Sequence, residues 1–369
     1  MATTPFPPAG AGMTPAEARK RIPGARPPIF WVGDAARLER VLARVRQGTV
    51  RHLCRTPGNR PMISVEYGTR EPVEHRANYN SAVGGRDPEA FADRGRREKP
   101  VVLLVGPVHG QETEALAGLA NLMYVLETGS DLEGRPHAEL REKAAKCRLL
   151  IVPVGNPDGM ARFEPGALVG MRRDDVRFWG QGTYADNTFC GWPECKRTHP
   201  MKGGAFLGCY FNDDGINPMH DDFFDPMGPE APAILKLAKE EAPDIAVSLH
   251  SHAGAPTVLR TAYAPLEVQQ DAFGLGERLN RLLALRGLPQ GSPRAASAEQ
   301  GAIPSPFNLT SALYHICGCL AFTFECPHGL SDPDACVVDY RQIVDIQLAL
   351  YEAMIDHSLE SRAAGCVAH

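Results

Sequence analysis

The stretch Val101-Val-Leu-Leu-Val-Gly-Pro-Val-His109-Gly-Gln-Glu112 decides the fold that we predict for this chain. Its five consecutive apolar residues predict a fully buried strand, which the following Gly-Pro pair ends. His109 and Glu112 then lie at a turn that opens into a helix. An imidazole and a carboxylate three residues apart at such a turn can point at one spot, and zinc accepts both groups as ligands. The alternative is a surface histidine beside a glutamate that the helix dipole favours.

Apolar strands alternate with helical patterns along the rest of the chain. Because this alternation is typical of a largely parallel sheet covered by helices, it predicts an α/β sandwich. We expect further strands at residues 61–67, 149–154, 244–250 and 320–325, and helices at residues 34–47, 112–127, 232–241, 266–286 and 339–361. Residues 71–98 and 288–312 are predicted to be loops.

Two segments depart from this alternation. Residues 1–30 are rich in Pro, Ala and Gly, and are predicted to form an irregular N-terminal arm. Residues 160–229 lose their apolar periodicity and are expected to form a long loop insertion. Loops of that length inside a compact domain are usually functional.

Composition narrows the classes of function. The formal net charge of -5 leaves no basic field to attract nucleic acid or an anionic membrane. The sequence shows no secretory pattern and no apolar run of membrane-spanning length, and its ten scattered cysteines predict reduced thiols. We therefore expect a cytoplasmic protein. Phosphate-binding, dinucleotide-binding and serine nucleophile motifs are missing, which argues against those chemistries.

Polar groups recur where the apolar strands end. His250 ends one predicted strand and Glu325 another, in addition to His109 and Glu112 after the first. Because ligands bind at strand ends in open α/β sheets, we expect these side chains to meet. Two histidines and one glutamate form the ligand set of hydrolytic zinc sites, with a fourth position for water. A further carboxylate must then act as general base, and Glu325 fits that role.

With these residues in place, the sequence resembles the M14 zinc carboxypeptidase family over roughly residues 60–360. The matching motifs occur in the family's order and are His109-Gly-Gln-Glu112, Asn156-Pro-Asp-Gly159, Leu249-His250-Ser251 and Phe322-Thr-Phe-Glu325. The resemblance implies a three-layer α/β/α sandwich with a mixed, largely parallel central sheet, in one catalytic domain over residues 31–369. It also implies one Zn2+ ion on His109, Glu112 and His250, with Glu325 as general base, and hydrolysis of a peptide bond near a free C-terminus.

The family's carbonyl-polarising arginine follows the Asn-Pro-Asp-Gly motif. Arg172 lies near the expected distance and is the preferred match for this catalytic role. Arg173 beside it is a candidate for substrate binding, and Arg177 is held in reserve. The alternative for each is a solvated loop arginine.

Residues 215–223 match the family's Gly-Val-Asp-Leu-Asn-Arg-Asn-Phe stretch imperfectly. Asn217 falls on the aspartate that orients the first histidine ligand, and His220 falls on the arginine that holds the substrate's terminal carboxylate. A neutral histidine is a poor substitute for a bidentate guanidinium. Asn217 can still accept a hydrogen bond from a ligand histidine. Nearby aspartates favour either a cationic substrate or a solvated loop, and they are Asp213, Asp214, Asp221 and Asp222.

Two further groups of residues were candidates for the site. The family's substrate-binding tyrosine has no counterpart at its usual distance before the catalytic glutamate; Tyr314 is closer, with core packing as its alternative. His252 is expected to line the pocket and His328 to make a structural hydrogen bond. A second zinc site would need an unusual spacing, so we expect reduced loop cysteines in the group Cys190, Cys195, His199 and Cys209.

The sequence thus predicts a zinc-dependent metallopeptidase with a peptide or acylated amino acid as substrate. One alternative is a zinc-dependent N-acyl-amino-acid deacylase of the aspartoacylase or succinylglutamate desuccinylase type. The other is a non-catalytic, metal-binding relative that uses the cleft and the long loop to bind a partner. The oligomeric state is left open.

Overall fold

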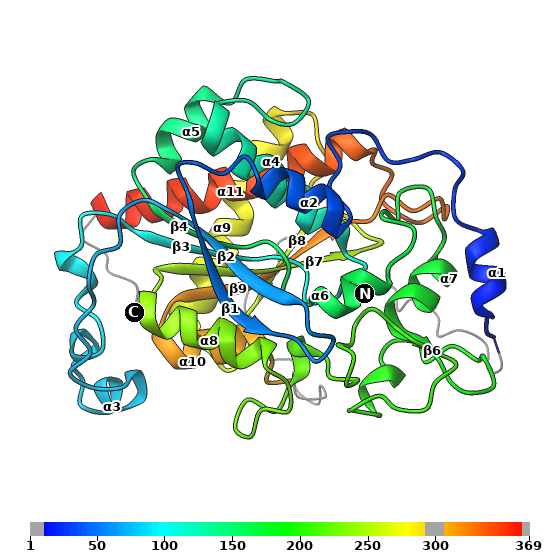
Figure 1. Cartoon of the computed structure of the whole chain (residues 1–369). Coiled ribbons are helices and arrows are strands. Elements are labelled where there is room, and N and C mark those ends of the chain that lie inside the picture. The colour runs from blue at the N-terminus through cyan, green and yellow to red at the C-terminus, as the bar shows by residue number, and fades with distance from the viewer. Residues whose placement is uncertain (1–10, 292–305, 364–369) are drawn as a thin grey trace.

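The computed structural model, which describes residues 11–291 and 306–363, is built around a seven-stranded mixed sheet (Figure 1). Its strands lie in the order β1-β2-β4-β3-β7-β9-β8. The inner strands β4, β3, β7 and β9 are parallel, whereas β1, β2 and β8 run antiparallel to their neighbours. The strands are β1 (Thr49–Arg55), β2 (Pro61–Tyr67), β3 (Val101–Val105), β4 (Arg148–Val152), β7 (Ile245–His252), β8 (Thr257–Arg260) and β9 (Leu320–Pro327).

Helices cover both faces of this sheet and make it the middle of three layers (Figure 1). On one face α11 packs against α4, α5 and α9, and on the other α8 packs against α10. The predicted three-layer fold with a mixed, largely parallel sheet is confirmed. These helices are α4 (Thr113–Thr128), α5 (Ala138–Ala144), α8 (Glu230–Glu241), α9 (Leu266–Leu285), α10 (Leu309–Cys317) and α11 (Tyr340–Ala363).

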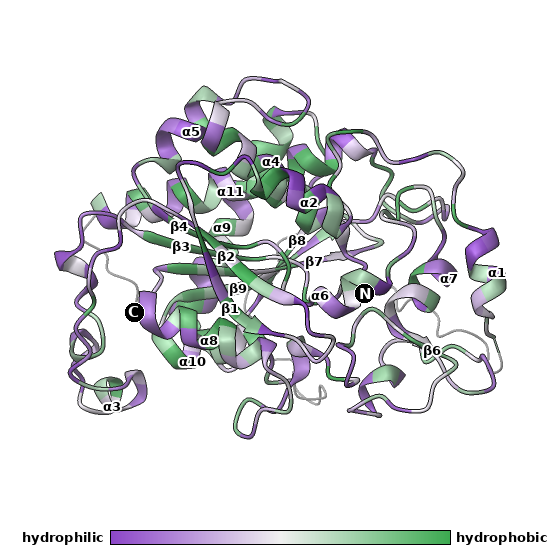
Figure 2. Ribbon diagram, in the orientation of Figure 1, coloured by the Kyte–Doolittle hydropathy of each residue, from purple (hydrophilic) through white to green (hydrophobic). Residues whose placement is uncertain are grey.

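The hydrophobic core lies between the layers, where strands and inner helix faces are apolar (Figure 2). Every residue of β3 and of β4 is buried, because helices cover both faces of these inner strands. Such strands are apolar throughout instead of alternating, which is why the run at 101–105 was recognisable from sequence.

Helix α2 (Ala35–Leu42) is shorter than predicted. As expected, the side chain of Asp34 caps it by accepting a hydrogen bond from the backbone N–H of Arg37. The helix ends at Leu42 and not near residue 47, because the backbone N–H groups of residues 46–48 donate to the carboxylate of Glu127 in α4. These bonds turn the chain out of the helix and into β1.

Strand β1 has no counterpart among the predicted strands. It forms the edge of the sheet and pairs only with β2, with a bulge between His52 and Cys54. Its side chains are exposed or half-buried, and its sequence therefore lacks the apolar run that marks an inner strand.

The predicted insertion is largely irregular but has small cores of its own. One cluster includes the buried rings of Phe178 and Trp179, and another includes Cys195, Tyr210 and Phe211. The short elements of this region are α6 (Pro157–Arg162), α7 (Arg173–Val176), the π turn η3 (Arg177–Gln181), the 3-10 turns η4 (Glu194–Lys196) and η5 (Pro218–His220), and the paired strands β5 (Gly182–Thr183) and β6 (Phe206–Leu207).

Part of the predicted N-terminal arm is ordered against this insertion. Helix α1 (Pro15–Lys20) begins with a capping box between Thr14 and Glu17. Met13 and Ala18 are buried in the same cluster as Trp179. The arm is therefore not irregular throughout; residues 1–10 lie outside the described residues.

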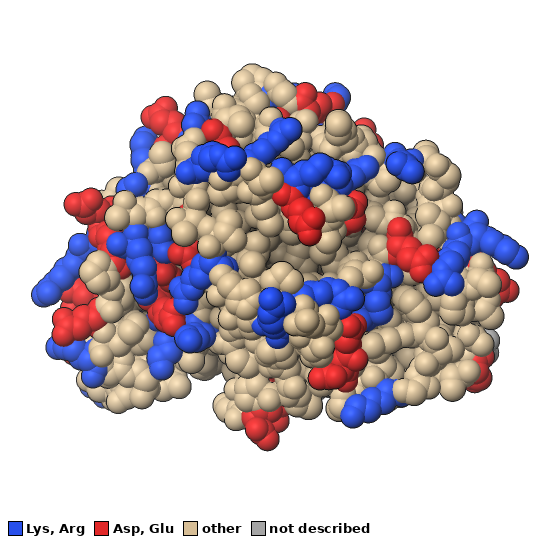
Figure 3. Space-filling view, in the orientation of Figure 1, with Lys and Arg blue, Asp and Glu red and all other residues tan. Residues whose placement is uncertain are grey.

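Short helices also interrupt the predicted loops. Residues 71–98 contain α3 (Tyr79–Gly84) and the 3-10 turns η1 (Pro88–Ala90) and η2 (Arg94–Arg96). Of the predicted loop 288–312, residues 292–305 lie outside the described residues, and α10 already begins at Leu309. On the face that Figure 3 shows, acidic and basic side chains are interspersed. Within residues 11–291 and 306–363, no helix combines the length and the apolar character needed to cross a membrane.

Candidate functional site

Three predicted site residues meet where β3 and β7 end. His109 and Glu112 lie in the turn between β3 and α4, and His250 lies near the carboxyl end of β7. The two strands are parallel neighbours, with Val105 opposite Ser248, so they deliver these side chains to one edge of the sheet. All three side chains are buried.

The ligand-type atoms of this triad converge. Nδ1 of His109 lies 2.9 Å from Oε1 of Glu112 and 3.2 Å from Nδ1 of His250. Nδ1 of His250 lies 3.1 Å from Oε2 of Glu112. In the part of the chain that the structure describes, this is the one cluster of three or more His, Cys, Asp or Glu residues that could hold a metal ion. Two imidazole nitrogens and a carboxylate that face one buried point fit zinc.

A different contact orients each histidine. The hydroxyl of Ser248, two residues before His250 on β7, lies 3.0 Å from its Nε2. A hydrogen bond at Nε2 leaves Nδ1 available to a metal. His109 instead stacks on Tyr210, with ring centroids 3.7 Å apart and planes within 8°. Its buried Nε2 has no hydrogen-bond partner among the described residues, so the stacked ring of Tyr210 and the contact of Nδ1 with Glu112 orient it.

The charge of the triad suits a cation. Burial acts to raise the pKa of Glu112, but the two histidines outweigh burial and lower that pKa to about 2. Burial lowers the pKa of His109, whereas for His250 the carboxylate of Glu112 overcomes burial and raises the pKa. An ionised carboxylate between two imidazoles is therefore present at neutral pH, and such a group attracts a metal ion.

Glu325 lies beside the triad on the next strand. It is in register with His250 across the parallel strands β7 and β9. Because in-register residues of paired strands point to the same face, the two side chains lie side by side. Glu325 is half-buried, and burial raises its pKa. A carboxylate with a raised pKa and access to solvent is suited to proton transfer.

The Asn-Pro-Asp-Gly motif shapes the turn that carries His109. Asn156 closes its own turn by accepting a hydrogen bond of 2.9 Å from the N–H of Gly159. A Cβ at Gly110 would lie 2.1 Å from the backbone of Gly159, so only glycine permits this approach. The N–H of Gly110 donates to the carbonyl of Cys209 at 2.7 Å, which fixes the loop of the stacking tyrosine against the same turn.

Asp158 anchors this unit to the hairpin of β1 and β2. Its fully buried carboxylate accepts hydrogen bonds from the hydroxyl of Thr56 at 2.5 Å and from the backbone N–H groups of Gly58 and Asp213 at 2.9 and 3.1 Å. It also pairs with Arg60 at 2.9 Å. Burial acts to raise its pKa, but these partners lower the pKa below the usual value.

We expect Asp158→Ala to lower the free energy of unfolding at pH 7 by about 3–5 kcal/mol, because it leaves several buried partners unsatisfied. Since the pKa is depressed in the folded protein, the contribution is present above the unfolded value of about 3.9 and is lost as the pH falls through the folded value. Urea unfolding of wild type and variant at pH 7 and pH 3 tests both statements. Asp225→Ala, at an exposed loop position, is the control. A cost below about 1 kcal/mol at pH 7 would contradict the anchoring role.

The candidate arginines lie on or beside α7. Arg173 pairs with Asp334 at 2.5 Å, and Arg177 pairs with Asp174 at 2.8 Å. Arg172 is exposed and makes no ion pair with any described residue. The segment just before α7 hydrogen-bonds to residues 329–331, which follow β9, so Arg172 is tied to the strand end that carries the candidate base.

His220 lies near enough to the triad for the charges of both triad histidines to act on its pKa, whereas Asn217 makes another contact. Burial lowers the pKa of His220 to about 2, with further contributions from positive charge on nearby groups that include His109 and His250. His220 is therefore neutral at neutral pH. The side-chain oxygen of Asn217 accepts a hydrogen bond from the N–H of Met219, so it caps a turn instead of orienting a ligand histidine.

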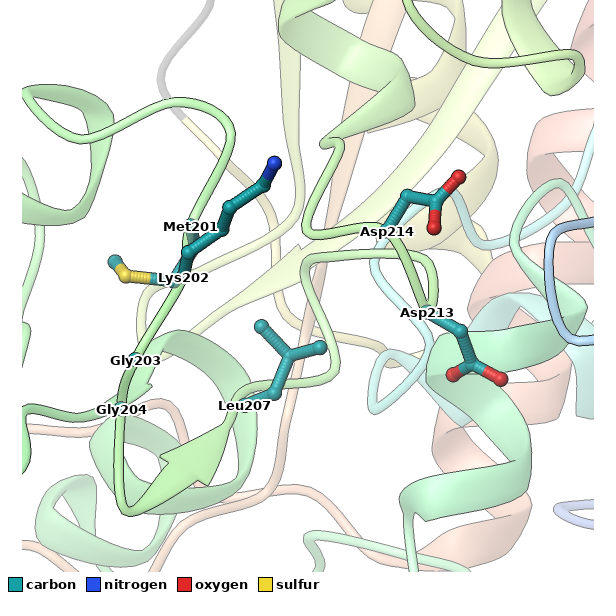
Figure 4. Close-up of a pocket in the computed structure, with 7 residues that line it drawn as sticks. All are labelled: Met201, Lys202, Gly203, Gly204, Leu207, Asp213 and Asp214. Atoms are coloured by element: carbon teal, nitrogen blue, oxygen red, sulfur yellow. The ribbon is translucent and has the colours of Figure 1, made fainter.

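The aspartates near Asn217 and His220 mostly stabilise the loop to which they belong. Asp213 pairs with Arg60 and with Arg162. The carboxylates of Asp221 and Asp222 accept hydrogen bonds from backbone N–H groups of residues 222–228. A surface hollow of about 300 Å³ separates Lys202 and its neighbours from the residues Asp213 and Asp214 (Figure 4).

Tyr314 lies in the hydrophobic core and not in this site. Helix α10 leads into the amino end of β9, opposite the end that carries Glu325. Tyr314 is 6% exposed, and its hydroxyl accepts a hydrogen bond of 3.3 Å from Tyr79. Tyr314 therefore packs in the core, which was the alternative to a role in substrate binding.

The remaining histidines and cysteines make local contacts. His252 bonds a backbone carbonyl within its own turn, and His328 pairs with the buried Glu114 at 3.2 Å. His199 accepts a hydrogen bond of 2.8 Å from the backbone N–H of Asn217. Burial raises to about 12 the pKa of each buried insertion cysteine, so these thiols are protonated at neutral pH; they are Cys190, Cys195 and Cys209.

Three residues near the triad were missed by the sequence analysis. Tyr210 and Lys196 lie in the insertion, where no periodicity relates them to a motif, so no pattern in the sequence marks them. The ammonium of Lys196 acts on the pKa of both triad histidines. The role of Ser248 could have been predicted from the sequence, because residues two apart on a strand point to the same face and Ser248 precedes His250 by two.

A sequence model of the family described as zinc carboxypeptidase matches residues 43–263, which is more than half of the chain. This match includes all three triad residues and ends before Glu325. No curated protein matches the chain in sequence.

Several solved structures share the fold. A metallo-carboxypeptidase from Burkholderia cenocepacia has a TM-score of 0.53 at 16% identity, over 87% of this chain and 68% of that one. Carboxypeptidase A from Helicoverpa armigera has a TM-score of 0.54 at 14% identity, over 95% of this chain and 78% of that one. Bovine thrombin-activatable fibrinolysis inhibitor has a TM-score of 0.53 at 10% identity, over 90% and 99%. At such identities the likeness establishes the fold alone.

Proposed function

Because this chain belongs to the zinc carboxypeptidase family, we propose that it is a zinc-dependent metallopeptidase that hydrolyses a peptide or amide bond. The observation that carries this proposal is the convergence of His109, Glu112 and His250 on one buried point, with Glu325 beside them. A binding module without catalysis has no need of a half-buried carboxylate at that position.

Different residues bind the metal, transfer the proton and stabilise charge in the proposed hydrolysis. A zinc ion held by His109, Glu112 and His250 would supply a Lewis acid and lower the pKa of a bound water. Glu325 takes the proton of the attacking water and passes it to the leaving nitrogen. Arg172 donates to the carbonyl oxygen as negative charge develops there.

Substrate binding is assigned to residues around this centre. Arg173 holds α7 in place through Asp334 and so positions its neighbour Arg172. His220 offers a neutral hydrogen-bonding group in the pocket, and Asn217 shapes the turn that carries it. No guanidinium lies at His220, and this difference keeps an N-acyl-amino-acid deacylase as the second candidate function.

A panel of chromogenic peptides and N-acyl amino acids, assayed with and without a chelator, tests the proposal. We expect turnover of at least one peptide, its loss on chelation and its return with zinc. Turnover of acyl amino acids alone would favour the deacylase. Binding without turnover of any substrate, insensitive to chelator, would favour the non-catalytic relative.

The stacking of Tyr210 on His109 gives a separate prediction. We expect Tyr210→Ala to weaken zinc binding by about 10- to 100-fold, because the ring plane of a ligand is then no longer set. Tyr210→Phe keeps the stacked ring and is expected to stay within about threefold of wild type. Competition with a chromogenic chelator measures both affinities. Equal losses in the two variants would show that the hydroxyl, and not the ring contact, matters.

A further inference from the structure

His328 and Glu114 form a buried pair that the proposed chemistry does not use. Nδ1 of His328 lies 3.2 Å from Oε1 of Glu114, and the two side chains are 3% and 0% exposed. Because an ionised carboxylate can only accept, the imidazole donates this hydrogen bond. Glu114 lies in the first turn of α4, two residues after the ligand Glu112. The pair therefore joins the segment that follows β9 to the turn that carries two metal ligands.

His328 also contacts the end of the strand that carries the third ligand. Its backbone N–H donates to the carbonyl of His252 at 2.8 Å, and His252 follows His250 on β7 by two residues. His328 itself follows Glu325 by three residues. One residue thus ties together the ends of α4, β7 and β9, and each contact lies close in sequence to a ligand or to the candidate base.

Stability alone does not account for this pair. Oε2 of Glu114 is buried and has no hydrogen-bond partner among the described residues. Burial of a carboxylate costs free energy that one hydrogen bond does not offset, and apolar residues of similar size often stabilise a fold equally well or better. Such departures from good packing are expected where function requires a particular geometry.

Glu325 depends on the protein for its position more than the metal ligands do. A bound ion holds its own ligands at fixed distances, whereas Glu325 is not one of the three converging residues. No described residue forms an ion pair or a hydrogen bond with the carboxylate of Glu325. The backbone at the end of β9 therefore sets where this carboxylate lies.

We propose that His328 is a positioning residue, which through Glu114 holds Glu325 at the distance from the metal ligands that proton transfer requires. The inference rests on the proposed function, since it concerns the support of the proposed base. A general base must stay within hydrogen-bond reach of its proton, and a displacement of about 1 Å can cost about 100-fold in rate. Loss of the pair should therefore lower kcat and leave zinc binding nearly intact.

Replacing both partners by leucine separates positioning from stability. The full-length Glu114→Leu/His328→Leu protein has no unpaired buried charge and should unfold at about the same urea concentration as wild type. We expect its kcat on a peptide substrate to fall about 10- to 100-fold, with KM within about twofold and zinc affinity within about threefold of wild type. His328→Asn, whose amide nitrogen can stand where Nδ1 stands, should keep kcat within about threefold of wild type.

His137→Leu is the matched control, because His137 pairs with the buried Asp131 at 3.1 Å beyond the opposite end of α4. It should leave kcat unchanged, whatever it costs in stability. The proposal is overturned if the leucine pair turns over as fast as wild type, or if His137→Leu loses as much kcat. A fall in kcat that only accompanies a loss of zinc affinity overturns it too.

Two further outcomes also decide against the proposal. Failure of the leucine pair to fold would show that the contact serves stability. An equal loss of kcat in His328→Asn would show that the hydrogen bond to Glu114 is not what positions Glu325. Failure of the proposed function has a different mark, which is the lack of chelator-sensitive turnover by the wild-type protein.

Discussion

Replacing Glu325 by glutamine is expected to lower kcat by about 10²- to 10⁴-fold, which is the usual contribution of a positioned general base. Glutamine keeps the shape of the side chain but cannot take a proton from water. The in-register position beside His250 places this carboxylate next to the metal-binding triad. Because Glu325 is not itself one of the converging ligands, zinc affinity should change little.

Steady-state kinetics and zinc competition on the same protein preparation separate these two effects. Glu267→Gln, at an exposed position of α9, is the matched control and should leave both quantities unchanged. A Glu325→Gln variant with wild-type turnover on a confirmed substrate would show that another group is the base. A loss of zinc together with activity would instead place Glu325 among the ligands.

Replacing His250 by alanine is expected to abolish zinc-dependent stabilisation as well as activity. Wild-type protein at a free zinc concentration about 1,000 times its Kd should gain about 4 kcal/mol of stability. The variant lacks one of three converging ligands, and Glu112 loses one of the two imidazoles that keep its pKa low. Zinc should therefore raise the melting temperature of wild type and leave that of the variant nearly unchanged.

Thermal unfolding with zinc and with chelator measures this difference. His52→Ala, at an exposed position of the edge strand β1, is the control and should respond to zinc as wild type does. An undiminished zinc response in His250→Ala would mean that the ion binds elsewhere. An increase in melting temperature that survives chelation would likewise argue against a metal effect.

Inner strands explain why much of the fold and the centre of the site could be predicted from the sequence. Strands buried on both faces are apolar throughout, and a polar residue at the end of such a run stands out. His109, His250 and Glu325 were found in this way, and parallel strands bring them to one edge. The edge strand β1 was missed because half of its environment is solvent.

Tertiary contacts explain what the sequence did not reveal. The end of α2 is set by hydrogen bonds to Glu127, about eighty residues away, and no local pattern encodes them. Tyr314 was proposed from its distance to Glu325 along the chain, but α10 and β9 together carry it to the opposite end of the sheet. Tyr210 reaches the triad from an aperiodic insertion, where position along the chain says nothing about position in space.

Titration of the metal-free protein with zinc, while hydrolysis of a peptide substrate is followed, tests whether the triad holds a catalytic zinc ion. We expect activity to rise from background in proportion to added zinc and to level off at about one ion per chain. Parallel titration of His250→Ala should give no such rise. Full activity of the metal-free protein, or an equal rise in the variant, would show that hydrolysis does not depend on zinc held by this triad.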